Sequence, residues 1–402
     1  MKKLLIIFLS IAVFLPLFAQ ENEQPEKKSI SFARRYFELG FGGGAGFAND
    51  LLGREDIFRK EIILDANEID ASISEDGINL NADLFGDFFI TVKDISIGDG
   101  KWNIGIFSGT DGRMDFNIPK NLVTLIAKGN HDHPFIAGMI SASGAVFAET
   151  GFDVSAKYGK LKVGLAPALF SPMLYIPKSG LSYTLDTHSG VFLSTSGDIS
   201  VYSPFVENGE LRFGLDVSTG GTYDLFSFLD VGGSLTHIPI APPTMRNRMR
   251  LTLEDATINM SGKDFLDDIK FELPDLDFKE YYDSEATKVF RPFRLDIFAR
   301  YKPIPFSREF LVIRPNMGFS VDINNGESYF NAGLQARLNL IDLFLLSVGS
   351  GREEGLWKQQ LGLVLNLRAF ELGLEASLRS QNFKDSFKGK GFGVGAGVRF
   401  GW

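Results

Sequence analysis

The stretch GFGVGAGVRFGW, residues Gly391–Trp402, alternates apolar side chains with glycine. Its even positions are all apolar, and every odd position except Arg399 is glycine. Residues two apart lie on the same face of a β-strand, so the stretch predicts a strand with one apolar face and one nearly bare face. A bilayer on one side and a crowded barrel interior on the other suit these two faces, and Trp402 is expected at the membrane boundary.

The same period of two recurs along most of the chain. Phe330–Leu340 (FNAGLQARLNL), Phe370–Leu378 (FELGLEASL) and Leu225–Leu235 are examples. We find about 16–18 candidate strands, most near the ~9–11 residues with which a tilted strand crosses a bilayer. The pattern predicts an all-β fold: a single transmembrane antiparallel β-barrel of about 14–16 strands, with short helical plug or connector segments.

A soluble β-sandwich is the main structural alternative, because its strands also alternate. The polar face of such a sandwich meets water and is normally rich in Lys, Glu and Thr. Here the second face holds mostly Gly, Asn, Ser and scattered charges. A closed barrel also leaves no unpaired sheet edge in the lipid, which favours the membrane interpretation.

The N-terminus predicts export. Lys2 and Lys3 precede the apolar run Leu4–Phe18, and Ala19 stands where a signal peptidase would cut. We therefore expect a signal peptide over 1–19 and an outer-membrane β-barrel domain over 20–402, placed in the bacterial outer membrane. Removing two lysines takes the formal charge of −9 to −11, and the chain has no cysteine. Disulfides are thus excluded, and an acidic chain is a poor candidate for binding nucleic acid.

The connections alternate between long and short when followed back from the C-terminus. The tight turns 368–369 and 341–342 separate the longer connections 380–390 and 349–355. Outer-membrane barrels have short periplasmic turns and longer external loops. The acidic connection Ser261–Pro292, the longest, is therefore expected on the external side. The compact turn Asn324–Gly326 has the Asn-Gly chemistry of hairpins.

Two stretches interrupt the strand pattern. Pro119–Asn130 (PKNLVTLIAKGN) predicts a short amphipathic helix that begins near Pro119 and stops at Gly129. Asn49–Ala71 is charged and predicts helix or irregular structure. Such segments either plug a lumen or connect strands, and the sequence leaves both interpretations open.

The C-terminal strand, with its terminal Phe400-x-Trp402, resembles the assembly signal of bacterial outer-membrane proteins. The resemblance implies that the barrel assembly machinery reads this strand and that its apolar residues face outward: Phe392, Val394, Val398, Phe400 and Trp402. An aromatic residue at the interfacial girdle of a last barrel strand accounts for the same pattern, and the two interpretations are compatible.

The length, the many strands and the block Asp111–Asn130 resemble the FadL-like superfamily of long-chain fatty acid outer-membrane transporters. In that superfamily a barrel of about fourteen strands holds an N-terminal plug, and hydrophobic substrates pass through it. The superfamily's N-terminal Asn-Pro-Ala hatch motif is absent here, where the mature N-terminus has only Pro25. No hatch residue is therefore carried over.

Catalytic and metal-binding patterns are weak. His131-Asp132-His133 could offer two imidazoles, but no third ligand completes a metal site. His188 and Ser189 would point to opposite faces of a strand, and in a turn they would lack rigid positioning. We therefore expect no enzyme activity, no catalytic residue, no metal and no cofactor.

The face opposite the apolar one carries residues that could line a lumen and tune its selectivity, or could simply pair and fill it. These lumen candidates are Arg212, Asp216, Arg294, Asp296, Arg300, Gln335, Arg337, Glu371, Glu375, Arg379 and Arg399.

Three functions fit this sequence. The first, carried by the FadL-like resemblance, is passive uptake of hydrophobic small molecules such as fatty acids. The second is a water-filled diffusion porin. The third is a surface or assembly protein that uses the barrel as an anchor. The expected partners are the outer-membrane lipid bilayer, the barrel assembly machinery and a hydrophobic ligand.

Overall fold

The structure is a computed structural model. It describes residues 36–49, 77–128, 135–186, 191–206, 209–246, 248–260, 278–303, 310–341, 343–367 and 369–401. The expected signal peptide, the charged stretch Asn49–Ala71 beyond its first residue, and Trp402 lie outside these described residues.

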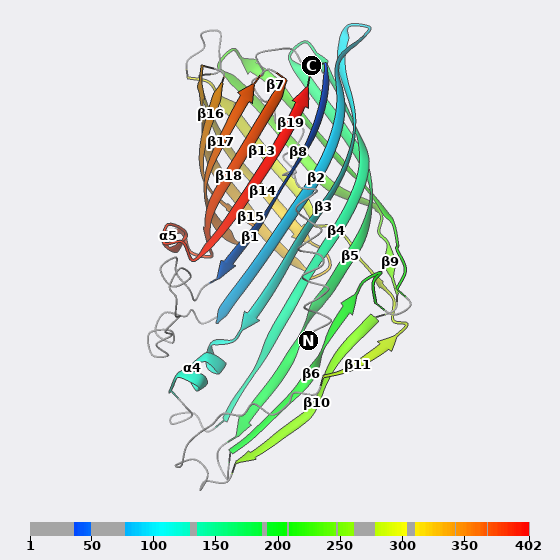
Figure 1. Ribbon diagram of the computed structural model, residues 1–402, viewed down its shortest axis with the longest axis vertical. Helices are drawn as coiled ribbons and strands as arrows, with labels where there is room; N and C mark the ends of the chain where they lie inside the picture. The colour runs from blue at the N-terminus through cyan, green and yellow to red at the C-terminus, as the bar shows by residue number, and fades with distance from the viewer. Residues whose placement is uncertain are drawn as a thin grey trace.

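Fourteen antiparallel strands form a closed ring (Figure 1). Closure comes from β1, which pairs with β2 on one side and with the last strand, β19, on the other. In chain order the ring contains β1 (Phe37–Asn49), β2 (Ile78–Ile97), β3 (Gly100–Ile118), β4 (Phe135–Tyr158), β5 (Leu161–Asp186), β7 (Gly214–Phe226), β8 (Leu229–Ala241), β13 (Phe293–Tyr301), β14 (Leu311–Asp322), β15 (Glu327–Leu340), β16 (Phe344–Glu353), β17 (Leu356–Leu367), β18 (Phe370–Ser380) and β19 (Gly391–Gly401). The barrel predicted from the period of two is confirmed.

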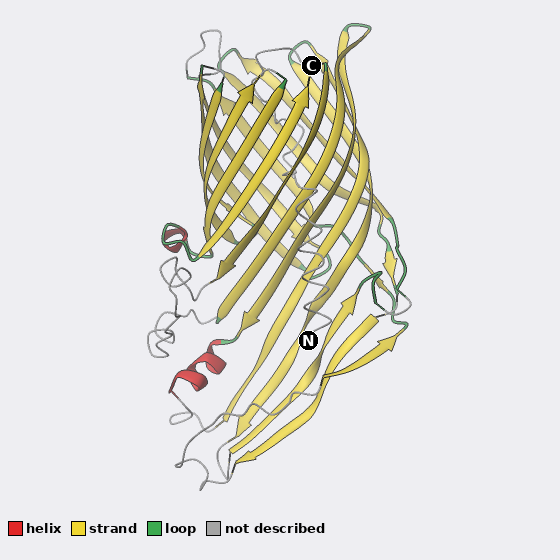
Figure 2. Cartoon of the chain, viewed as in Figure 1, coloured by secondary structure: helices red, strands yellow, loops and turns green. Residues whose placement is uncertain are grey.

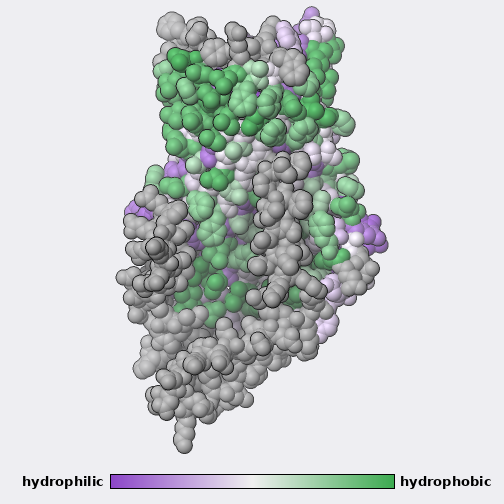
Figure 3. Space-filling view, viewed as in Figure 1, coloured by the Kyte–Doolittle hydropathy of each residue, from purple (hydrophilic) through white to green (hydrophobic). Residues whose placement is uncertain are grey.

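The outer face of the ring is apolar. Ile106 on β3, Phe152 on β4 and Ile297 on β13 are 46%, 62% and 55% exposed, whereas their inward neighbours Gly105, Gly151 and Asp296 are buried. Hydrophobic side chains gather on the face of the ring seen in Figure 3. The outward face of a membrane barrel meets lipid, and the exposed apolar side chains on this face suit that environment.

The last strand has the two faces that its sequence predicts. Phe392, Val394 and Phe400 are exposed on the outer face of β19, with Val398 half-buried among them, whereas Arg399 is buried on the inner face. The Phe400 ring lies 6.3 Å from that of Phe41 on β1 and 5.4 Å from that of Phe370 on β18. These contacts extend the apolar face across the junction where the ring closes.

The connections at the two ends of the ring differ in length. Turns at 98–99, 159–160, 227–228, 341–343 and 368–369 join strands at the end where the C-terminus lies (Figure 1). The other end carries longer connections, including 242–292, and the compact turn 323–326, where Gly326 has a φ of +67°. The connection between β8 and β13, which contains Ser261–Pro292, leaves the ring on the expected side, away from the C-terminus. The expected longer connection 349–355 is wrong, because β16 and β17 stay paired up to the two-residue turn 354–355.

One turn contradicts the predicted strand boundaries. The stretch Leu225–Leu235 reads as one strand, but the chain reverses at 227–228, between β7 and β8. The rings of Phe226 and Phe228 stack there with centroids 5.3 Å apart, beside Tyr301. Apolar residues at a turn near the membrane boundary conceal the turn, because turns in soluble proteins are usually polar.

Three strands form an extension outside the closed ring. β5 pairs with β7 through Leu161–Phe170 and with β6 (Val191–Tyr202) through its last residues. β6 pairs with β10 (Arg248–Met260), and β10 pairs with β11 (Phe278–Asp283). These strands lie at the end of the ring opposite to the C-terminus (Figure 1). A separate two-stranded sheet, made of β9 (Thr244–Met245) and β12 (Thr287–Lys288), joins the residues before β10 to the residues after β11.

Two short helices connect strands (Figure 2). α4 (Lys120–Lys128) confirms the helix expected over Pro119–Asn130, and α5 (Phe383–Ser386) joins β18 to β19. α4 packs Val123 against Ile78, and the Tyr183 hydroxyl of β5 donates a hydrogen bond to Asn121. It is therefore a connector at the strand ends and not a plug. No helix in the described part of the chain is long and apolar enough to cross a membrane.

Candidate transport site

The ring strands place most of the lumen candidates on inward-facing positions. Asp216, Asp296, Glu371, Arg379 and Arg399 are buried there. Arg294, Arg300, Gln335, Arg337 and Glu375 are half-buried at alternate positions of the same strands. Arg212 is placed elsewhere, in the irregular stretch before β7, where it pairs with Glu210 between the exposed side chains of Leu211 and Phe213.

Ion pairs near the short-turn end join neighbouring strands. Arg399 on β19 lies 3.7 Å from Glu371 on β18, and Lys302, just after β13, lies 2.8 Å from Asp230 on β8. Pairs between adjacent strands lie along the wall. They neutralise inward charges without bridging the barrel interior.

Ion pairs near the other end cross the lumen. Arg113 on β3 binds Glu354 in the turn between β16 and β17 at 3.0 Å, and Lys178 on β5 binds Glu327 on β15 at 3.2 Å. Each pair connects strands that are not neighbours, because four other strands of the ring lie between β3 and β17 and between β5 and β15. Arg113 also binds Asp115 at 2.9 Å and stacks over the ring of Tyr329, 5.5 Å from its centroid.

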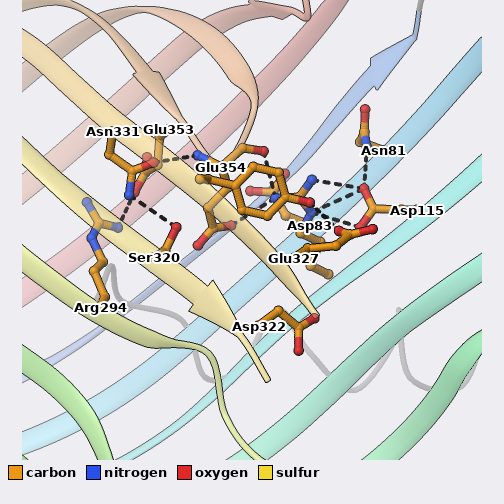
Figure 4. A network of polar contacts seen from close by, with 12 residues as sticks. Asn81, Asp83, Asp115, Arg294, Ser320, Asp322, Glu327, Asn331, Glu353 and Glu354 are labelled. Atoms are coloured by element: carbon orange, nitrogen blue, oxygen red, sulfur yellow. Dashed lines mark hydrogen bonds and ion pairs between the residues drawn. The ribbon is translucent and has the colours of Figure 1, made fainter. Parts of the chain in front are cut away.

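The two crossing pairs meet at Tyr329, whose ring lies under the Arg113 guanidinium and whose hydroxyl donates a hydrogen bond to Glu327 (Figure 4). Further polar contacts extend from them. The Asn331 amide donates to Ser320, and the Glu354 backbone N–H donates to Asn331. Glu353 pairs with Lys358 at 2.9 Å and with Arg294, which in turn pairs with Asp296 at 2.6 Å. On the facing strands the network continues through Asn81–Asp115 and Asp83–Arg379. Polar residues that hold one another in this way occupy the barrel interior at this level.

Arg291 is the most deeply buried charged side chain of this region. It belongs to the segment 289–292 between β12 and β13, and its side chain is 1% exposed. Its guanidinium binds Glu149 on β4 at 2.5 Å, Asp216 on β7 at 3.3 Å and Asp111 on β3 at 3.0 Å. A residue of a connection therefore reaches across the inside of the barrel to three separate strands.

An apolar cluster, the inner aromatic cluster, lies beside Arg291. It consists of Phe147, Phe170, Tyr175, Tyr202, Met245 and Val289, all at most 4% exposed. The Phe170 ring lies 5.8 Å from the Arg291 guanidinium carbon, and the Phe147 and Phe170 rings meet edge to face at 6.0 Å. Val289 brings the segment 289–292 into this cluster, and Phe290 exchanges two hydrogen bonds with Asn324.

A small pocket of about 20 Å³ lies in the barrel wall where β5, β7, β8 and β13 meet. Its lining combines Phe298, which is buried on the inner face, with Val163, which is exposed on the outer face. Glycines fill much of the wall between them: Gly164, Gly220, Gly221 and Gly233. Because glycine has no side chain, these positions leave an apolar hollow between the inner and the outer face of the wall.

The structure describes only one of the four histidines. His237 on β8 places its Nδ1 3.1 Å from the Pro292 carbonyl, and its backbone N–H donates to Ser218. His131, His133 and the His188–Ser189 pair lie outside the described residues. Within the described ranges, no group of three or more His, Asp or Glu side chains could hold a metal ion.

The sequence did not point to Arg291, Asp111, Glu149 or Arg113 as site residues. Asp111, Arg113 and Glu149 lie on the inward positions of β3 and β4, so their place in the alternation is a usable signal. No comparable signal marks Arg291. It follows β12, a strand of only two residues, and lies far along the chain from the carboxylates of Asp111, Glu149 and Asp216.

No family model matches this chain, and no curated protein matches its sequence. Solved structures do match. They include the Ralstonia pickettii toluene transporter TbuX, with 9% identity, 94% of this chain and 92% of that chain covered, and a TM-score of 0.49. The Pseudomonas putida toluene transporter TodX also matches, with 9% identity, coverages of 96% and 94% and a TM-score of 0.49. A Pseudomonas aeruginosa FadL homologue matches with 9% identity, coverages of 96% and 95% and a TM-score of 0.49.

Proposed function

We propose that this chain is a bacterial outer-membrane barrel through which small hydrophobic molecules, such as fatty acids, cross by passive diffusion. The observation that carries the proposal is the barrel wall where β5, β7, β8 and β13 meet. Four glycines there leave a hollow between the inner-face residue Phe298 and the outer-face residue Val163. At about 20 Å³ the hollow holds no more than a water-sized group, so an apolar molecule crosses only when this thin part of the wall opens.

The interior also argues against a water-filled porin, whose lumen is polar and open. Here the end with the long connections is crossed by the Arg113–Glu354 and Lys178–Glu327 pairs. The inner aromatic cluster packs against the same region. An aqueous path would need these groups to separate.

A change that fills the pocket tests the proposal. A Cβ built at Gly233 lies 3.1 Å from the Asp296 carbonyl oxygen and otherwise no closer than 3.9 Å, so Gly233→Val fills the hollow with only a small shift. Gly373→Val on β18 is the matched control, because its nearest neighbours are at 3.9 Å and it lies outside the pocket. Both variants should retain the heat-modifiable mobility of a folded barrel.

The measurement is uptake of labelled oleate and labelled toluene into outer-membrane vesicles that contain each protein. We expect Gly233→Val to slow uptake of at least one probe by tenfold or more, and Gly373→Val to match the wild type. Uptake that requires the barrel but is equally fast in both variants would contradict the pocket as the route. Absence of uptake for every hydrophobic probe by folded wild-type protein would favour the anchor role, for which the extension β6–β10–β11 offers a surface outside the ring.

A further inference from the structure

The connection between β18 and β19 folds back onto the outer face of the barrel wall. Trp357 and Gln359 on β17 share the outward positions of the exposed Leu361. Gln359 donates a 2.9 Å hydrogen bond to the hydroxyl of Ser386 in α5, which is buried. The Trp357 ring meets the Phe383 ring of α5 edge to face, with centroids 4.9 Å apart. α5 is therefore held on the outside of the ring, at the end with the long connections (Figure 1).

Two aromatic rings of this connection remain exposed. Phe383 and Phe387 are 46% and 58% exposed, and their rings meet edge to face at 5.3 Å. With Trp357 they form an aromatic group at the rim of the apolar outer face. A membrane barrel carries aromatic residues of this kind at the boundary between lipid and water. The group therefore lies at the level of the lipid headgroups.

Arg352 places a positive charge on the outer face beside this aromatic group. It is exposed near the end of β16 and pairs in register with Trp357, so the two side chains are neighbours. Every other outward position of β16, β17, β18 and β19 is uncharged. Glu353, which follows Arg352, is bound by Arg294 inside the barrel. The Arg352 charge therefore stands alone on the outer face of these four strands.

The α5 connection adds further positive charge. Asp385 is the one acidic residue in 381–390, and it binds Lys388 at 3.0 Å and Lys390 at 3.7 Å. Lys384 is exposed, and neither it nor Arg352 has an ion-pair partner among the residues that the structure describes. The whole chain has a formal net charge of −9, so this part of the outer face is opposite in sign to the protein as a whole.

We call the exposed cations and aromatic rings of this region the outer ledge: Arg352, Trp357, Phe383, Lys384, Phe387 and Lys388.

We propose that the outer ledge binds the phosphate groups of an anionic lipid in the external leaflet. Arg352 and Lys384 donate charge-assisted hydrogen bonds to phosphate oxygens, which both side chains do readily. Phe383 and Phe387 contact the adjoining part of the acyl chains. Basic side chains at this level of a membrane attract anionic headgroups, and the aromatic rings fix the depth at which they meet. The proposal requires that the outer face meets lipid, but it is independent of what crosses the barrel.

Native mass spectrometry of the folded barrel in a non-ionic detergent tests the proposal, with diphosphoryl lipid A as the probe. Wild type should retain the lipid. The double variant Arg352→Gln/Lys384→Gln should bind it at least about tenfold more weakly, because two headgroup contacts are lost. Lys101→Gln/Lys160→Gln is the matched control: it removes the same charge from exposed positions at the short-turn end and should bind as the wild type does. All the substituted side chains are exposed, so each protein should keep the heat-modifiable mobility of a folded barrel.

The same lipid without its phosphates separates a phosphate site from a merely apolar surface. Wild type should bind this lipid at least about tenfold more weakly than diphosphoryl lipid A. Equal binding of the two lipids would overturn the proposal, as would absence of lipid A binding by folded wild type. Unchanged binding by the ledge variant, or equal losses in the two double variants, would overturn it as well. These outcomes do not involve uptake of oleate or toluene, so the proposed function is tested separately.

Discussion

At the scale of single residues, the barrel interior is held by arginines that each serve several acceptors. Arg379 is representative: its side chain is 8% exposed, and it binds Asp83 on β2 and the Ser377 hydroxyl. Removing one partner of a buried ion pair leaves the other charge without compensation, which costs more than the pair itself contributes. These arginines are therefore expected to matter more to stability than exposed ion pairs do.

Arg379→Met should lower the free energy of unfolding by about 1–3 kcal/mol, because Asp83, whose side chain is 32% exposed, would keep a half-buried charge without its partner. Urea unfolding of the barrel in lipid vesicles measures this change. Lys388→Met is the control: Lys388 is exposed and pairs with Asp385 in the α5 connection, so the expected loss is about 1 kcal/mol or less. Equal losses for the two variants would contradict this view of the interior.

Single residues also mark the limit of prediction from sequence. Asp216 could be named because it alternates with apolar neighbours on one strand. Its partner could not, since the contact between Asp216 and Arg291 depends on how a connection folds back into the ring. Periodicity assigns a residue to a face. It carries no information about which distant residue meets it there.

At the scale of elements, the sequence pattern predicted the strands and their two faces, but it did not predict where the strands end. β19 has the two faces that its alternation predicts, and Val394 is 58% exposed on the outer one. The turn at 227–228 was hidden by apolar residues. The extension was missed because β5, at 26 residues, pairs first with β7 in the ring and then with β6 in the extension, and its sequence stays mostly apolar through this change of partner.

Val394→Lys should destabilise the folded barrel by about 2–4 kcal/mol, because it places a charge on the lipid face of β19. The folded fraction, read from heat-modifiable mobility after refolding into vesicles, measures the effect. Val394→Leu keeps the face apolar and should refold as the wild type does. Normal refolding of Val394→Lys would mean that this face does not meet lipid.

The extension should lose stability in acid. Arg248 on β10 donates hydrogen bonds to Asp283 on β11, one of them 2.7 Å long, and these bonds hold the pKa of Asp283 below its ordinary value. A carboxylate with a lowered pKa stabilises the fold above its unfolded pKa of about 3.9, and that contribution is lost as the pH falls further. The difference in thermal midpoint between wild type and Asp283→Asn should therefore be present at pH 6 and shrink towards pH 3. A difference that stays constant over this range would exclude Asp283 as its source.

At the scale of the whole molecule, the closed ring has an apolar outer face, and side chains that bind one another cross its interior. The Arg113–Glu354 pair, the ion pairs of Arg291 and the inner aromatic cluster all lie towards the end with the long connections. The sequence predicted the barrel and its orientation, because both follow from local alternation and connection lengths. Whether the lumen is open depends on long-range pairs, so the sequence kept the water-filled porin as an alternative to hydrophobic uptake through a plugged barrel.

Ionic conductance in a planar bilayer tests the closed interior most directly. Folded, heat-modifiable protein is inserted, and the current is followed at fixed voltage in concentrated potassium chloride. We predict no large, stable current steps, because side chains that bind one another cross the lumen. Large, stable steps from demonstrably folded wild-type protein would contradict this and would show an open aqueous pore.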